Sequence, residues 1–138
     1  MFKILSIALL SVTAIFVQDL QWYPTNSNEI EAKCREQYPL ADEMIANENG
    51  HLKVKHNPTF RSYLFCTAMG KNLYSPEVGF IAERLAYEIQ NTYKYNCPLN
   101  LIQDCIDNSY EDSYSEDIIY FNIMKCILEN AFEECESV

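Results

Sequence analysis

The chemistry open to this chain depends first on its cysteines. Six cysteines occur among the 138 residues, at Cys34, Cys66, Cys97, Cys105, Cys126 and Cys135. None has the Cys-x-x-Cys spacing typical of redox or zinc sites. An even number of cysteines in an exported chain predicts up to three disulfides. Six cysteines allow 15 connectivities, so their spacing alone does not choose among the pairings.

Other residue types give little support for catalysis or metal binding. His51 and His56 are the two histidines, with no cysteine at metal-ligand spacing, and no catalytic motif surrounds any serine. The acidic stretch DNSYEDSYSED, residues 107–117, predicts a solvated loop and lacks the alternating acids and central glycine of a calcium-binding loop. We therefore expect no enzyme, no metal site and no cofactor.

The amino-terminal residues are typical of a secretory signal. Lys3 precedes an apolar run from Ile4 to Val17, which at about 14 residues is shorter than the roughly 20 needed to span a bilayer. We expect a signal peptide over residues 1–19, with cleavage between residues 14 and 20, and one domain over residues 20–138. The expected product is a secreted, extracellular protein without stable membrane insertion.

The net charge of −10 limits the partners of the chain. An acidic surface repels phosphate backbones and anionic lipids, which argues against binding nucleic acid or a membrane surface. The same surface tolerates a cationic ligand, and it also keeps an exported protein in solution.

Hydrophobic periodicity predicts an all-α domain of about six helices, because glycines are few and strand-like alternation is rare. The pattern predicts a loop over residues 51–57 and burial of the last helix by its neighbours, since that helix is apolar nearly all round. Helices are expected over residues 28–37, 40–50, 58–69, 75–93, 98–108 and 118–132.

Helix-capping signals define two of these starts. Ser75 fits an N-cap and Pro76 the first helical position of the fourth helix. The last helix has a capping box formed by Ser113 and Glu116, or Ser115 as an alternative cap.

The helices, the signal and the six cysteines together resemble the insect odorant-binding protein superfamily. In that family the first cysteine pairs with the third, the second with the fifth and the fourth with the sixth. If Cys34, Cys66, Cys105 and Cys126 are the first, third, fourth and sixth, the resemblance implies bridges from Cys34 to Cys66 and from Cys105 to Cys126.

The family's second and fifth cysteines would then fall at Ser62 and Asp117. These positions are bonded partners in the family, so one whole bridge is missing, as in the "C-minus" branch. Losing both halves avoids an orphaned thiol liable to exchange with other disulfides.

A rival register takes Cys126 and Cys135 as the fifth and sixth family cysteines, but it leaves Cys34, Cys66 and Cys97 without consistent roles. In the favoured register, Cys97 and Cys135 have no counterpart among the family cysteines. They would form a third bridge within the chain, or Cys135 would bond a second chain and give a homodimer.

Two further branches of the family share local sequence with this chain. The stretch CTAMGKNLY from Cys66, and the interval from Cys105 to Cys126, resemble the odorant-binding-like venom allergens of ants. The stretch IIYFNIMKCILENAF from Ile118 resembles the last family helix of short salivary proteins of blood-feeding flies.

The resemblance implies a helical cage around an internal apolar cavity that holds one small apolar or amphipathic ligand. Tyr63 and Tyr120 could donate a hydrogen bond there to an oxygenated ligand. The inward helical faces supply the expected lining residues: Phe60, Tyr63, Leu64, Ile81, Leu85, Ile89, Ile119, Tyr120, Phe121, Ile123 and Met124.

Three functions follow from this interpretation. One is a carrier of an odorant, a pheromone or a similar molecule. A second is a venom or salivary effector that sequesters a small molecule, with the acidic residues 107–117 as a mouth for an amine. The third is a disulfide-stapled structural domain without a ligand, because the same apolar stripes would also fill a solid core.

The missing bridge gives a direct test of the cysteine register. Changing Ser62→Cys and Asp117→Cys together should form the absent disulfide and stabilise the fold by about 3 to 4 kcal/mol. Either change alone should not stabilise it, because a single thiol has no partner. Thermal unfolding and thiol titration measure both effects, and a folded double variant with two free thiols would show that the register is wrong.

Overall fold

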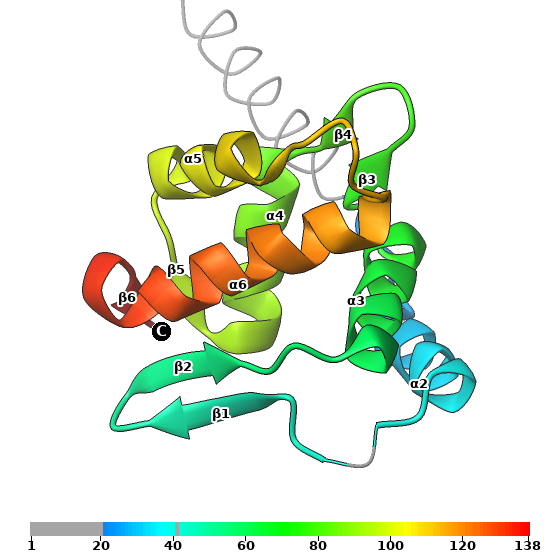
Figure 1. Cartoon of the computed structure of the whole chain (residues 1–138), viewed down its shortest axis with the longest axis horizontal. Helices are drawn as coiled ribbons and strands as arrows, with labels where there is room; N and C mark the ends of the chain where they lie inside the picture. Colours follow the sequence, from blue (N-terminus) through cyan, green and yellow to red (C-terminus); the bar gives the residue numbers. More distant parts are fainter. Residues whose placement is uncertain (1–20, 41) are drawn as a thin grey trace, which may run out of the picture.

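The computed structural model describes residues 21–40 and 42–138, so the expected signal and its cleavage points lie outside the described residues. This part of the chain is mostly helical, as predicted (Figure 1). Its α-helices are α2 (Ser27–Gln37), α3 (Pro58–Gly70), α4 (Ala82–Glu88), α5 (Leu99–Ser109) and α6 (Glu116–Glu134), and a π-helical segment, η1 (Ile89–Tyr93), continues α4. The described residues thus hold five α-helices, so the expectation of about six is not confirmed.

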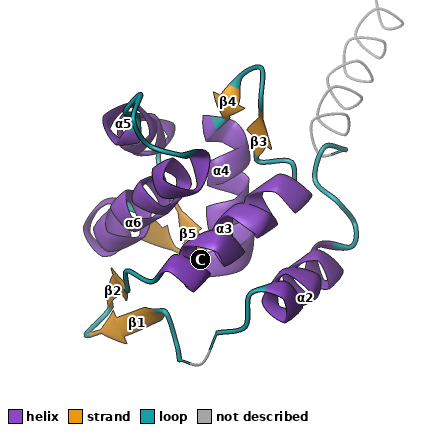
Figure 2. Cartoon of the chain, turned by 45° about the vertical axis from the view of Figure 1, so that its right-hand side comes forward, coloured by secondary structure: helices purple, strands orange, loops and turns teal. Residues whose placement is uncertain are grey.

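Three short antiparallel strand pairs accompany the helices, although the sequence predicted none (Figures 1 and 2). They are β1 (Ile45–Glu48) with β2 (His51–Val54), β3 (Tyr74–Ser75) with β4 (Gly79–Phe80), and β5 (Tyr95–Asn96) with β6 (Glu136–Ser137).

Helix α6 is the centre of the fold. It packs against α5, α3 and β2, and in Figure 1 it crosses the middle of the molecule with these elements on different sides. Residues on every face of α6 are therefore buried, as its sequence predicted. The buried residues of α6 are Ile119, Tyr120, Phe121, Ile123, Met124, Ile127, Leu128 and Ala131.

The helix expected over residues 40–50 is wrong, because β1 and β2 form a hairpin there. Glu48 pairs with His51, and the two linking residues, Asn49 and Gly50, have φ of 56° and 89°. Positive φ at both positions is the requirement of a type I′ turn, for which Asn-Gly is the preferred sequence. The loop expected from residue 51 is consequently a strand as far as Val54.

The helix expected from Ser75 begins only at Ala82. Ser75 accepts a hydrogen bond from the Glu77 amide through its Oγ (3.3 Å), so it closes a turn between β3 and β4. Gly79 has φ of 87°, which is not helical, and Val78 is 72% exposed. The apolar stripe of the helix therefore starts after the hairpin.

Helix α6 has Ser115 in the N-cap position, which confirms the alternative prediction. The predicted capping box from Ser113 is therefore wrong. The Ser115 side chain makes no capping bond to the helix backbone. Its Oγ instead donates to Asp117 Oδ1 (2.5 Å), while Asp117 Oδ2 accepts from Arg61 Nε of α3 (3.1 Å).

Three disulfides join Cys34 with Cys66, Cys105 with Cys126 and Cys97 with Cys135, which are the three expected pairs. The first fastens α2 to α3, the second fastens α5 to α6, and the third holds the β5–β6 pair. All six cysteines lie in the described residues and none is free. In this arrangement Cys135 is not available for a bond to a second chain.

The hairpin turn gives a prediction about stability. Placing a non-glycine residue in the left-handed conformation costs about 1 to 2 kcal/mol. Gly50→Ala should destabilise the fold by more than this, because the added Cβ would also lie 2.5 Å from Phe132 Cε2. In a Phe132→Ala background the same change should cost less, since only the backbone strain remains. Urea unfolding of the four chains measures the difference, and equal costs in both backgrounds would contradict the contact.

Candidate functional site

A pocket of about 390 Å³ lies between α2, α3, η1 and the segment that leads from α2 into β1. Its lining falls into three chemical classes. The apolar residues are Leu40, Met44, Ile45, Phe60 and Leu64. The hydroxyl-bearing residues are Tyr63, Thr67, Thr92, Tyr93 and Tyr120, and the charged residues are Glu31, Arg35, Asp42, Glu43, Lys71 and Glu88.

Helix α3 supplies one wall of the pocket. It starts at an N-cap in which the Asn57 side chain accepts from the Phe60 amide (3.1 Å), with Pro58 at the first helical position. Phe60, Leu64, Thr67 and Lys71 then follow at steps of three or four residues, so they share one face. The pocket wall is therefore the buried face of this helix.

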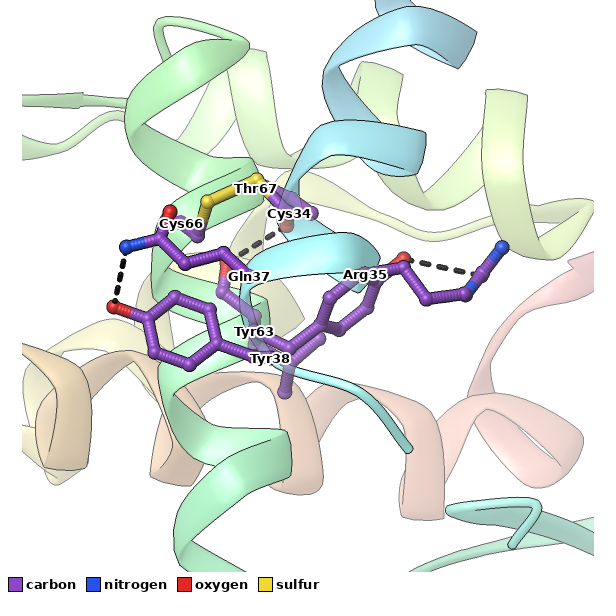
Figure 3. The surroundings of a disulfide bond; sticks show 8 residues. Cys34, Arg35, Gln37, Tyr38, Tyr63, Cys66 and Thr67 are labelled. Carbon is purple, nitrogen blue, oxygen red and sulfur yellow. Dashed lines mark hydrogen bonds between the residues drawn. A yellow bond between two sulfur atoms is a disulfide. The ribbon is translucent and has the colours of Figure 1, made fainter. Parts of the chain in front are cut away.

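The Cys34–Cys66 disulfide joins α2 to α3, close to two residues that line the pocket, Arg35 and Tyr63 (Figure 3). Next to it, Arg35 of α2 donates through Nη2 to the phenol of Tyr63 (3.3 Å), and its guanidinium lies 5.6 Å from the centre of that ring. The bridge and this contact fix the side chain of Tyr63 at the pocket.

A buried ionic cluster crosses the inner part of the pocket. Lys71 is 2% exposed, and its Nζ lies 2.5 Å from Glu31 Oε1 and 3.0 Å from Glu88 Oε2. Glu88 Oε1 also accepts hydrogen bonds from Thr92 Oγ1 and from the phenol of Tyr23. The cluster thus links α2, the end of α3 and α4, and it satisfies a charge that would be costly to bury alone.

Titration of the cluster follows from its neighbours. Burial would lower the pKa of Lys71, but Glu88 and Glu31 outweigh that effect, and the pKa is raised above its usual 10.5. A folded-state pKa above the unfolded value means that the stabilisation is complete below pH 10.5 and is lost as the pH rises through the folded-state pKa. Lys71 is therefore a cation at physiological pH.

The pocket phenols remain protonated. Burial is the main cause that raises the pKa of Tyr63, Tyr93 and Tyr120, and the carboxylate of Glu88 adds to it for Tyr93 and Tyr120. A protonated phenol donates one hydrogen bond. Within the described residues no hydrogen bond occupies the hydroxyls of Tyr93 and Tyr120, so both can serve a bound molecule.

Four of the eleven predicted lining residues lie at this pocket: Phe60, Tyr63, Leu64 and Tyr120. The others do not line it, and an internal apolar cage is not confirmed. Ile81 is half-buried at the start of α4, and the remaining six are buried in the core around α6. These six are Leu85, Ile89, Ile119, Phe121, Ile123 and Met124.

The charged members of the pocket were missed by the sequence analysis. Lys71 follows Gly70 at the predicted end of a helix, where a lysine is normally solvated. One signal was present, because Lys71 continues the buried face of α3 four residues after Thr67, and Glu88 and Thr92 are also four apart.

Metal binding and membrane spanning were assessed for residues 21–40 and 42–138 of the structure. No group of three or more His, Cys, Asp or Glu residues there is placed to hold a metal ion. In the same residues, no helix combines the length and the apolar character needed to cross a membrane.

Comparison with protein-family models, with curated proteins and with solved structures finds no match for this chain. A functional proposal therefore depends on the geometry of the pocket and on the pattern of cysteines and helices.

The ionic cluster should carry a large share of the stability. Lys71→Met should destabilise the fold by about 3 to 5 kcal/mol, because Glu88 would remain buried and charged without its partner. Glu31→Gln should cost much less, since Glu31 is partly exposed and Glu88 still pairs with Lys71. Urea unfolding at neutral pH compares the two, and a Lys71→Met chain as stable as the parent would contradict this role.

Proposed function

We propose that this chain is a secreted carrier that binds one small amphipathic molecule in the pocket between α2, α3 and η1. The observation that supports the proposal is the pairing of an apolar wall with the hydroxyls of Tyr93 and Tyr120, which have no hydrogen-bond partner among the described residues. The volume of about 390 Å³ falls in the range of about 300 to 1,000 Å³ typical of small-molecule sites.

The lining favours a ligand with an apolar body and one oxygen. Phe60, Leu64 and Met44 offer apolar contact, while Tyr93 and Tyr120 offer phenol donors. An alcohol, an aldehyde or an ester would accept from these donors and leave its carbon chain against α3. An alkane of the same shape would leave the phenols unpaired, which costs free energy in a buried site.

The charges of the pocket argue against an anionic ligand. Four carboxylates line it against two bases, and Lys71 is already engaged by Glu31 and Glu88. An anion would meet this excess of negative charge without a free buried cation to bind it. The expected ligand is therefore neutral or cationic.

The resemblance of the cysteine pattern to insect odorant-binding proteins supports the same class of function. The bridges Cys34–Cys66 and Cys105–Cys126 are those that this resemblance implies, and three disulfides suit an oxidising compartment. A carrier of odorants or pheromones and a venom or salivary protein would use the same pocket. The tissue of expression separates these two roles.

A structural domain without a ligand is the second candidate. It is favoured by the close burial of six predicted lining residues, of which Leu85, Ile89 and Ile123 are fully buried in the core. In that role the pocket would hold only solvent.

Displacement of a fluorescent probe tests the proposal. N-phenyl-1-naphthylamine should bind with increased fluorescence, and a long-chain alcohol should displace it. Tyr93→Phe with Tyr120→Phe should weaken binding of the alcohol about tenfold, the cost of one or two neutral hydrogen bonds, and should leave binding of an alkane of equal length unchanged.

Tyr114→Phe is the matched control, since Tyr114 is an exposed phenol outside the pocket. A chain that never binds the probe would support the structural domain. Binding of probe and alcohol that is unchanged in the double variant would place the ligand elsewhere.

A further inference from the structure

The acidic loop that joins α5 to α6 has no part in the pocket. It spans residues 110–115, and Tyr114 closes a turn within it by donating its amide to the carbonyl of Glu111 (3.0 Å). The Cys105–Cys126 bridge fastens the two helices that flank the loop. The loop is thus an exposed segment held on a fixed base.

The loop holds the exposed tyrosines of this protein. All ten tyrosines lie in the described residues, and eight of them are buried or half-buried. Tyr110 is 44% exposed and Tyr114 is 42% exposed.

The two phenols differ in their contacts. The Tyr110 hydroxyl accepts from the Phe80 amide (3.5 Å), and a Cβ added to Gly79 would lie 2.5 Å from that oxygen, so the hydroxyl is packed against the β3–β4 turn. Within the described residues no hydrogen bond holds the hydroxyl of Tyr114. Tyr114 is therefore the phenol that another protein can reach.

The chain on both sides of Tyr114 carries acidic residues and no basic ones. Glu111 and Asp112 precede it and are exposed, Glu116 and Asp117 follow it, and no basic residue occurs between Lys94 and Lys125. Arg61 of α3 faces this region and pairs with Asp117 (3.1 Å), and within the described residues Glu111 and Asp112 pair with no base.

We infer that Tyr114 is a site of tyrosine O-sulfation. An enzyme that uses an adenylyl sulfate donor must bind a polyanionic nucleotide, so its cleft is basic, and acidic residues around an accessible phenol are attracted to that cleft. The inference depends on passage of the chain through the secretory pathway and does not depend on ligand binding in the pocket.

The transfer step balances without any other reactant. The phenol oxygen of Tyr114 forms a bond to the sulfur of the donor as the bond between that sulfur and the donor's phosphate oxygen breaks. The phenol proton passes to a base of the transferase, and the nucleotide leaves as a bisphosphate. The loop gains one more negative charge.

Sulfation of the purified, disulfide-bonded chain by a tyrosylprotein sulfotransferase tests the inference apart from secretion. With 3′-phosphoadenylyl sulfate as donor, intact mass should show one added SO₃ group on the parent chain and on Tyr110→Phe, and none on Tyr114→Phe. Thermal unfolding of each variant checks that it is folded. No transfer to the parent, or equal transfer to Tyr114→Phe, would overturn the assignment.

A second comparison tests the role of charge. Replacing Glu111→Gln and Asp112→Asn together should slow the transfer about tenfold, in line with the loss of electrostatic steering. An unchanged rate would overturn the electrostatic basis of the assignment. Chain secreted from cultured eukaryotic cells should carry the same single SO₃ group, and its absence there would overturn modification in the cell.

Discussion

The fold depends on one constraint, which is the burial of α6. A helix that is apolar nearly all round must be covered on all sides, and no single neighbour can do this. Helix α5, helix α3 and the strand β2 each cover one side, and behind them α4 packs on α5, α2 on α3 and β1 on β2. The β1–β2 hairpin is also attached to α6, because the Val54 amide donates a hydrogen bond to the Glu129 side chain (3.0 Å).

Around this apolar axis the pocket introduces polar chemistry. Lys71, Glu88 and Glu31 form a buried cluster in a region that apolar residues could also have filled, and such substitution is often neutral or stabilising in other proteins. The cluster fixes the end of α3 against α2 and α4 in one arrangement. It also leaves the hydroxyls of Tyr93 and Tyr120 beside polar groups, so the pocket differs from a purely apolar cage.

Elements with helical periodicity were predicted correctly from the sequence, and the prediction was wrong where the backbone forms hairpins instead of helix. Local patterns predicted three features: the burial of α6, the start of α3 at Pro58 and the end of α2 before Pro39. The hairpin at Asn49 and Gly50 had a clear turn signal, but the apolar residues before it also fitted a short helix.

The site was harder to predict than the fold. An apolar stripe looks the same in a solid core and at a pocket, which is why Phe60 and Leu64 were grouped with Leu85 and Ile123. Lys71 was missed because burial of a charge depends on partners that are distant in the sequence, here Glu31, which lies 40 residues earlier.

The disulfides divide the chain into two separate covalent rings. One ring closes between Cys34 and Cys66, and a second, from Cys97 to Cys135, encloses the smaller ring of Cys105 and Cys126. Residues 67–96 are the sole covalent strap between them, and the pocket takes its walls from both rings and from the strap. Across α3 and α6, where a Ser62 to Asp117 bridge would have joined the rings, the partly exposed Arg61–Asp117 pair contributes at most about 1 kcal/mol. Beyond the strap, only noncovalent contacts hold the two rings together, chiefly the packing of α6 against α3 and β2, so the proposed ligand would enter between them without any covalent bond breaking.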